Sequence, residues 1–125
     1  MTRVLVIDDD DDIRFVIKLN LEAAGYEVVE CGDGIQAMDA LGHELPDVIV
    51  CDIMMPGLDG YGVLEQLRGQ DETASIPLLF LSAKGADQEV WQGWQSGADY
   101  YLTKPFDPDE LLNFIQYIEA NHMVV

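Results

Sequence analysis

Short apolar runs that end at polar or turn residues recur along the chain and predict buried strands. Two of them place four consecutive apolar side chains directly before an acid, Asp8 in one case and Asp52 in the other. Their length, their Val and Ile content, and the turn residues Pro56 and Gly57 beyond the second favour strands over segments of buried helix. The five predicted strands cover residues 3–7, 26–31, 48–52, 76–81 and 100–103.

Apolar residues at helical spacing follow each predicted strand and indicate five helices. Asp33 opens the second helix, Asp59 can cap the third, and Asp107 with Pro108 and Glu110 forms a capping box at the start of the last. The expected apolar faces are Ile13, Val16, Ile17, Leu21 and Ala24 in the first helix; Ala37, Met38 and Leu41 in the second; Tyr61, Leu64 and Leu67 in the third; Val90, Trp91, Trp94 and Ala98 in the fourth; and Leu111, Phe114, Ile115 and Ile118 in the fifth.

Strict alternation of strands and helices predicts an α/β fold with a doubly wound parallel sheet. Each crossover helix returns the chain so that the next strand runs in the same direction, and the helices then cover both faces of the sheet. A length of 125 residues without a Pro- or Gly-rich break indicates one domain. We expect this domain to span residues 1–121 and to be followed by a tail of residues 122–125.

Composition narrows the possible partners and the location. A formal charge of −18, from 24 acids against six Lys and Arg, argues against direct nucleic-acid binding because no basic stripe can neutralise phosphates. No apolar run approaches the roughly 18 residues needed to span a bilayer, so no membrane association is expected. Residues 1–7 lack the features of a secretory signal, which predicts a cytoplasmic protein whose Cys31 and Cys51 are reduced.

Polar side chains lie at the ends of four of the predicted strands. They are Asp8 and Asp9 after the first, Asp52 at the end of the third, Ser82 after the fourth and Lys104 after the fifth. Because the carboxyl ends of parallel strands share one edge of the sheet, we expect these side chains to meet there. Clustered carboxylates repel each other unless a cation neutralises them. Oxygen ligands suit Mg²⁺ better than zinc, so the pattern predicts a magnesium site, in which Mn²⁺ could substitute.

The remaining acids of the run, Asp10, Asp11 and Asp12, are interpreted as a solvated loop. Their spacing imitates a calcium-binding loop, but Ile13 stands where such a loop requires glycine. A calcium loop is therefore excluded.

The same edge carries the side chains needed to accept a phosphoryl group. Asp52 stands alone at its strand end and is the expected nucleophile, whereas the paired Asp8 and Asp9 have the arrangement of metal ligands. Ser82 and Lys104 can hold phosphoryl oxygens. The pattern therefore predicts formation of an aspartyl phosphate at Asp52.

Four motifs in order resemble the receiver domain of two-component response regulators. They are residues 4–10, 52–60, 81–84 and 97–106, and the resemblance covers essentially the whole chain. It implies a flavodoxin-like sheet of five strands in the order 2-1-3-4-5. It also implies that Asp52 accepts a phosphoryl group from a histidine kinase or phosphotransfer protein, and that Mg²⁺ is held by Asp8, Asp9, Asp52 and the backbone carbonyl of Met54. Such a domain is not an enzyme in the usual sense, since it catalyses only its own phosphorylation and dephosphorylation.

By the same resemblance, the domain is a two-state switch. Ser82 and Lys104 match the positions that bind the phosphoryl group, and Ser82 and Tyr101 match the hydroxyl and aromatic switch positions. Their movement would change the face formed by the fourth helix, the fifth strand and the fifth helix, where a downstream protein or a fused output domain would bind. The Lys104–Pro105 peptide is expected to be cis. The chain is expected to be a monomer or a phosphorylation-dependent homodimer.

Met54 and Lys84 each lie two residues after a site residue, where side chains in this family influence the water that removes the phosphate. Met54 cannot orient a water molecule by hydrogen bonding. We therefore expect slower autodephosphorylation than in receivers with a polar residue at this position.

Two other functions and one other domain arrangement are consistent with parts of the sequence pattern. A Mg²⁺-dependent phosphatase with an aspartyl nucleophile usually has a second acid where this chain has Met54. A flavin-binding protein needs a phosphate loop after the first strand, and the five acids there would repel phosphate. The chain can also be the input domain of a longer regulator, which its sequence does not distinguish from a stand-alone receiver.

Overall fold

Five parallel strands form one sheet in the computed structural model, which describes residues 2–83 and 99–122. The strand order is β2-β1-β3-β4-β5, so the α/β class and the order 2-1-3-4-5 are confirmed. The central β3 is buried at all five residues, as expected for a parallel strand covered on both faces. The strands are β1 (Arg3–Ile7), β2 (Glu27–Cys31), β3 (Val48–Asp52), β4 (Leu78–Ala83) and β5 (Tyr100–Lys104).

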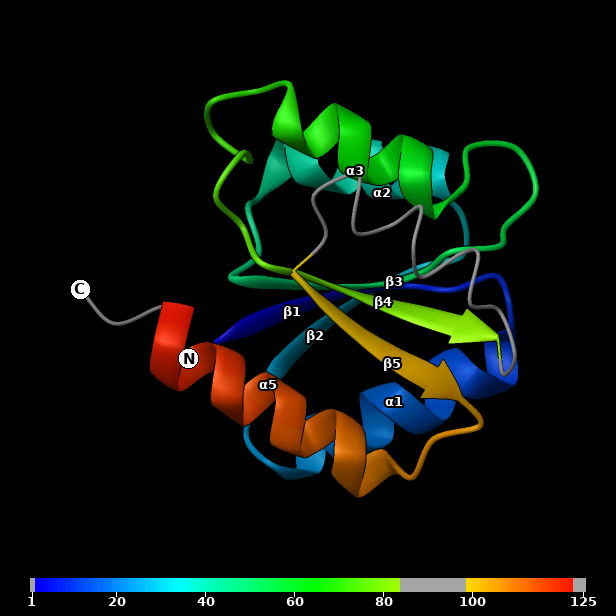
Figure 1. The fold of residues 1–125 in the computed structure, drawn as a ribbon, viewed down its shortest axis with the longest axis vertical. Helices are drawn as coiled ribbons and strands as arrows, with labels where there is room; N and C mark the ends of the chain where they lie inside the picture. The colour runs from blue at the N-terminus through cyan, green and yellow to red at the C-terminus, as the bar shows by residue number, and fades with distance from the viewer. Residues whose placement is uncertain (1, 84–98, 123–125) are drawn as a thin grey trace.

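Helices cover both faces of the sheet. Figure 1 shows α2 and α3 on one face and α1 and α5 on the other. The described part of the chain holds four helices, and the fourth of the five expected, over residues 90–98, lies outside it. None of these four helices has a stretch long and apolar enough to cross a membrane. Their bounds are α1 (Asp11–Ala23), α2 (Gly34–His43), α3 (Gly60–Arg68) and α5 (Pro108–His122).

Aspartates begin the helices, because a side-chain oxygen accepts hydrogen bonds from backbone N–H groups that lack a partner within the helix. Asp33 and Asp59 cap α2 and α3 as expected. In α5 the expected capping box is present: Asp109 N donates to Asp107 Oδ1 at 2.9 Å, and Asp107 N donates to Glu110 Oε1 at 3.1 Å.

The interpretation of Asp10, Asp11 and Asp12 as a solvated loop is wrong. Asp10 is the N-cap of α1, where it accepts from Asp12 N and Ile13 N, and the next two aspartates form the first helical turn. Negative side chains are favourable at this position because the helix dipole places partial positive charge there. The run of acids is therefore partly explained by the start of a helix.

The buried face of α1 is narrower than the sequence pattern predicted. Ile17 and Leu21 are buried, and Ile13 is partly buried in the same stripe. Val16 is 43% exposed because it lies about 100° around the helix from Ile17. Ala24 is exposed as well, since it follows the last helical residue as the C-cap.

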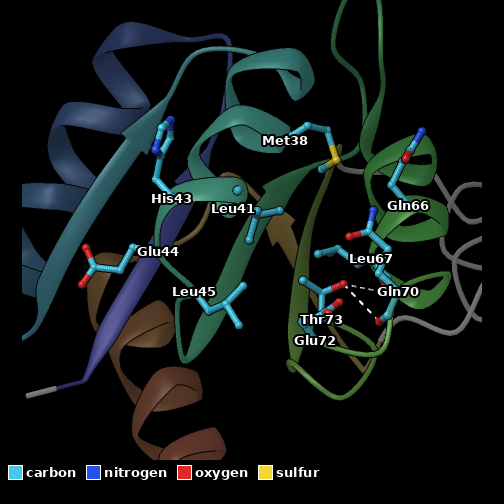
Figure 2. Close-up of a pocket in the computed structure, with 11 residues that line it drawn as sticks. Met38, Leu41, His43, Glu44, Leu45, Gln66, Leu67, Gln70, Glu72 and Thr73 are labelled. Atoms are coloured by element: carbon cyan, nitrogen blue, oxygen red, sulfur yellow. Dashed lines mark hydrogen bonds between the residues drawn. The ribbon is translucent and has the colours of Figure 1, made fainter.

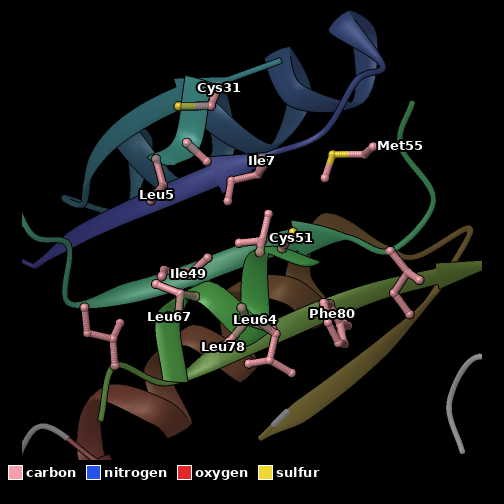
Figure 3. Close-up of a cluster of buried hydrophobic side chains, with 14 residues drawn as sticks. Leu5, Ile7, Cys31, Ile49, Cys51, Met55, Leu64, Leu67, Leu78 and Phe80 are labelled. Atoms are coloured by element: carbon pink, nitrogen blue, oxygen red, sulfur yellow. The ribbon is translucent and has the colours of Figure 1, made fainter. Parts of the chain in front are cut away.

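Two apolar clusters hold the helices against the sheet. Alternation along β3 directs Ile49 and Cys51 towards α2 and α3, and Val48 and Val50 towards α1 and α5. Figure 3 shows the first cluster, in which Phe80 of β4 packs beneath α3. Both cysteines are buried and free.

An aspartate and an arginine tie the start of β5 to β4. Asp99 Oδ2 accepts from Leu78 N at 2.9 Å and from Arg68 Nη2 at 3.0 Å, and Asp99 N donates to Leu78 O at 3.2 Å. The resulting register pairs Ala83 with Lys104 at the opposite end of the strands. The clamp at one edge of the sheet thus determines where Lys104 lies at the other.

The connection from β3 to α3 depends on two glycines. Gly57 has a φ of +76°, a backbone conformation that glycine adopts without a steric penalty. Gly60 N donates to Ile53 O at 2.8 Å, and a Cβ at Gly60 would lie 2.7 Å from Asp52 O and 2.8 Å from Ile53 Cα. The helix α3 therefore begins in direct contact with the end of β3.

We expect Gly60→Ala to lower the free energy of unfolding by about 2 kcal/mol, the usual scale for a side chain forced into filled space. Gly42 provides a matched control in α2, because a Cβ there meets nothing within 4 Å. Gly42→Ala should raise stability by about 0.5–1 kcal/mol through its higher helix propensity. Urea unfolding followed by circular dichroism measures both. Equal effects of the two substitutions would contradict the close packing at Gly60.

Candidate functional site

Three carboxylates meet at the carboxyl edge of the sheet. Ile7 of β1 pairs with Cys51 of β3, so the next residues, Asp8 and Asp52, lie side by side. Oxygen atoms of Asp8, Asp9 and Asp52 all lie within 4.8 Å of one another. Asp8 is fully buried and Asp52 is 7% exposed, whereas Asp9 is exposed to solvent. The structure therefore brings together the three acids that the sequence placed at this edge.

Lys104 reaches over the strand ends to two of these acids. Its Nζ lies 3.1 Å from Asp8 Oδ2 and 3.4 Å from Asp52 Oδ2. The second oxygen of Asp8 accepts a hydrogen bond from Asp10 N at 2.9 Å. One ammonium group and one backbone N–H thus partly offset the energetic cost of removing two carboxylates from water.

The environment of Asp52 disfavours its negative charge. Burial, followed by the charge of Asp8, raises the pKa of Asp52 to about 6, although Lys104 acts in the opposite direction. Burial by itself would lower the pKa of Lys104, but the charges of Asp52 and Asp8 outweigh it and the pKa is raised. Three acids against one lysine leave an excess of two negative charges when all are ionised. A divalent cation matches that excess, and the donor set of carboxylate oxygens suits Mg²⁺.

Ser82 lies beside this cluster. Ser82 directly follows Leu81, and Leu81 pairs with Asp52 where β3 and β4 run side by side. The side chain is 1% exposed, and Ser82 Oγ has no hydrogen-bond partner among residues 2–83 and 99–122. A buried hydroxyl of this kind can donate to an oxygen brought in by a ligand.

Tyr101 lies on the same face of the sheet as Ser82. It pairs with Phe80, which precedes Ser82 by two residues on β4. The two rings are 5.9 Å apart, and the ring of Phe80 also meets Tyr61 edge-on at 5.6 Å. Burial raises the pKa of Tyr101 to about 12. The residue as a whole is half-buried, and its hydroxyl oxygen is buried.

Two further expectations concern the loops around the site. The Lys104–Pro105 peptide is cis, as expected. Met54 lies in the connection between β3 and α3 with its side chain 61% exposed, and the role expected for its backbone carbonyl stays a prediction. Lys84 lies outside the described residues.

Arg14 was not among the residues predicted for this site. This residue donates from Nη1 to the backbone carbonyl of Asp8 at 2.8 Å and contacts Asp11 through Nη2 at 2.7 Å. One signal was available, since Arg14 is one of only six Lys and Arg residues and closely follows five consecutive acids.

A separate cavity of about 500 Å³ lies between α2 and α3 near the amino ends of β3 and β4 (Figure 2). Apolar residues such as Met38 and Leu41 line it, and Thr73 Oγ1 is satisfied by donating to Leu67 O at 2.6 Å. Within the described ranges, Asp8, Asp9 and Asp52 form the one cluster of acids, His or Cys close enough to share a metal ion.

Comparison with known proteins agrees with this geometry. Residues 4–116 match the family model of the response regulator receiver domain. The DNA-binding dual master transcriptional regulator RpaA of Synechocystis sp. is 47% identical over 112 residues, which are 90% of this chain and 46% of that protein. The alkaline phosphatase synthesis transcriptional regulatory protein PhoP of Bacillus subtilis is 42% identical over 109 residues, covering 87% of this chain and 45% of that protein. The chain spans about half the length of these curated relatives.

Solved structures show the same fold. The receiver domain of the Francisella response regulator 1452 superposes with a TM-score of 0.87 at 38% identity and covers 96% of this chain and 98% of that one. The chemotaxis protein CheY4 of Vibrio cholerae gives a TM-score of 0.89 at 33% identity, with 94% and 98% covered. The strand order, the acidic cluster and these matches agree, and the chain belongs to the response regulator receiver domains of two-component signal transduction.

Proposed function

We propose that this domain is a phosphoacceptor switch in which Asp52 receives a phosphoryl group from the phosphohistidine of a histidine kinase or phosphotransfer protein. The observation that carries the proposal is the contact of Lys104 with both Asp8 and Asp52 at the carboxyl edge of the sheet. The contact supports the proposal because the proposed nucleophile, an ammonium group and carboxylate oxygens that could bind a metal lie within one small site.

Mg²⁺ is the proposed cofactor, and Mn²⁺ can substitute for it. Asp8, Asp9, Asp52 and the backbone carbonyl of Met54 would hold the ion. Support comes from the excess of negative charge in the cluster and from its purely oxygen donors. When bound, the ion supplies positive charge that stabilises the oxygens of the transferring phosphoryl group.

Asp52 is the proposed nucleophile. A carboxylate oxygen of Asp52 forms a bond to phosphorus as the phosphorus–nitrogen bond of the phosphohistidine breaks, and the electron pair of that bond stays on the imidazole nitrogen. Lys104 pairs with a phosphoryl oxygen, for which it must partly exchange its contacts with Asp8 and Asp52. Ser82 Oγ donates to another oxygen. Positioning and charge stabilisation therefore account for the reaction, with no separate acid or base.

A relay from Ser82 through Tyr101 is the proposed output. Movement of Ser82 towards the phosphoryl group would leave space that the ring of Tyr101 can enter. Tyr100, the preceding residue on β5, faces α5, with ring centres 6.2 Å from Phe114 and 6.0 Å from Tyr117. A shift of β5 would therefore change the surface that β5 and α5 form together with the fourth helix expected from the sequence.

The proposed partners follow from this switch. A kinase or phosphotransfer protein supplies phosphate, and a downstream protein or fused output domain reads the surface of the fourth helix, β5 and α5. Because the curated relatives are about twice as long and are named as regulators of transcription, the output can be a DNA-binding domain outside residues 1–121. The receiver itself is proposed to be cytoplasmic, to bind neither nucleic acid nor membrane, and to be monomeric or to dimerise when phosphorylated. A phosphatase is disfavoured by Met54, which replaces the second acid.

Acetyl phosphate tests the phosphoacceptor directly. With Mg²⁺ present, the wild-type protein should gain the mass of one phosphoryl group in intact-mass spectra, because the clustered groups suffice without a kinase. Removing Mg²⁺ with EDTA or introducing Asp52→Asn should abolish the adduct. An undiminished adduct in Asp52→Asn, or none on the wild type, would overturn the assignment of Asp52.

The exposed Met54 predicts a long-lived phosphate. Met54→Asn introduces a side chain that can orient the attacking water, so the half-life of the phosphoprotein should shorten several-fold, about the effect of partial general-base assistance. The measurement follows loss of the phosphoryl mass after acetyl phosphate is removed. Met54→Leu is the matched control and should keep the wild-type half-life. The idea fails if the asparagine and leucine variants decay alike.

The raised pKa of Asp52 predicts a pH-dependent loss of stability in the metal-free protein. Since the folded-state pKa is about 6 and the ordinary value is 3.8, folding favours the protonated acid, and this stabilisation is lost as pH rises through about 6. Asp52→Asn should therefore be more stable than wild type by about 3 kcal/mol near pH 7.5, and the difference should shrink towards about pH 4.

Urea unfolding in EDTA at several pH values measures this difference. Asp71→Asn changes an exposed carboxylate and is the control, expected to shift stability little at any pH. A constant difference between Asp52→Asn and wild type across the range would show that ionisation of Asp52 has no energetic cost.

A further inference from the structure

Arg14 joins three segments around the acidic cluster. Its side chain is 17% exposed and extends from the first turn of α1 across the ends of β1 and β2. Nη1 donates to Asp8 O at 2.8 Å, Nη2 pairs with Asp11 Oδ1 at 2.7 Å, and Nε pairs with Glu30 Oε1 at 3.3 Å. All three guanidinium nitrogens therefore contact an oxygen atom, an arrangement that lysine cannot reproduce.

These contacts lie on both sides of Asp9. The backbone of Asp8 is held before it, by Arg14 and by the hydrogen bond from Asp8 N to Cys31 O at 3.1 Å. Asp10 is held after it as the N-cap of α1. Asp9 itself is exposed, and its backbone neighbours on both sides are held while one of its oxygens lies within 4.8 Å of oxygens of Asp8 and Asp52.

The five consecutive acids, Asp8 to Asp12, do not all have the same role, and the pairing of Arg14 with Asp11 contributes to this difference. Five consecutive carboxylates could compete for one cation, but Asp10 is occupied in capping and Asp11 is paired with Arg14. The cluster close enough for a shared metal contains only Asp8 and Asp9 from this run, together with Asp52, within the described residues.

We infer that Arg14 is a positioning residue for the cation site: its guanidinium fixes the junction of β1 and α1 so that Asp8 and Asp9, and not Asp11, present oxygens to Mg²⁺. The inference rests on the proposed function, since it names how that metal site is built. Arg14 makes no contact with the metal-facing oxygens, and its effect passes through the backbone of Asp8 and the side chain of Asp11.

An electrostatic role and a positioning role of Arg14 predict different changes in the affinity for Mg²⁺ when Arg14 is replaced, which makes the inference testable. Arg14→Gln removes a positive charge close to an acidic site, so a purely electrostatic role would make Mg²⁺ bind more tightly. Arg14→Lys keeps the charge and would leave the affinity unchanged in that case. If Arg14 acts by positioning, both variants should bind Mg²⁺ about tenfold more weakly, the usual scale for residues that orient metal ligands.

Titration of the purified, metal-free protein with MgCl₂ by isothermal calorimetry measures the affinity without phosphorylation. Arg3→Gln is the matched control, because Arg3 contacts Glu27, Glu44 and the carbonyl of Leu45 at the opposite end of β1. It should lower stability in urea unfolding and leave the Mg²⁺ affinity unchanged. Asp8→Asn should abolish specific binding.

The outcomes separate the inference from the proposed function. Weaker binding by both Arg14 variants with normal binding by Arg3→Gln supports the positioning role. Unchanged or tighter binding by Arg14→Gln, or an equal loss in Arg3→Gln, overturns it while the metal site stands. Absence of binding by wild type, or normal binding by Asp8→Asn, overturns the metal site and with it this role of Arg14. If Arg14→Gln does not fold, Arg14→Lys decides between the two.

Discussion

The ionic contact of Lys104 with two buried carboxylates is the constraint on which the structure of the site depends. Asp8 and Asp52 lie on neighbouring strands and repel each other, and Lys104 arrives from a strand two places further along the sheet. Removing Lys104 would leave two buried carboxylates without their ammonium partner and would cost about 3–5 kcal/mol. The strand register must therefore hold the carboxyl ends of three strands, β1, β3 and β5, in place at once.

The surrounding structure supplies that register at points distant from the charges. Arg68 and Asp99 align β5 with β4 at the amino edge, and Gly60 lets α3 begin against the end of β3. The apolar clusters on both faces stabilise the sheet sufficiently to tolerate an acid whose ionisation is unfavourable. Burial and the charge of Asp8 disfavour the negative charge of Asp52, and the cation proposed for this site would neutralise it.

The sequence by itself determined the class of fold and the composition of the site. Apolar runs of four residues before Asp8 and Asp52 identified strands, and strict alternation with helices required a parallel sheet whose carboxyl ends share one edge. That rule placed Asp8, Asp9, Asp52, Ser82 and Lys104 together without any coordinates. Capping residues such as Asp59 were also predictable, because their hydrogen bonds are local.

Only the tertiary structure decided which long-range contacts these residues make. The sequence pattern did not reveal that Arg14 holds the carbonyl of Asp8 or that Val16 faces outwards. The cap of α1 by Asp10 is a local contact, and it was missed because five acids stand in a row there. Nor could periodicity reveal that Gly60 has no room for a Cβ, since the contact is with Asp52 and Ile53 across a turn. Local patterns report hydrogen bonds and apolar faces within one element, whereas burial, pKa and close packing depend on segments distant in sequence, which the sheet brings together.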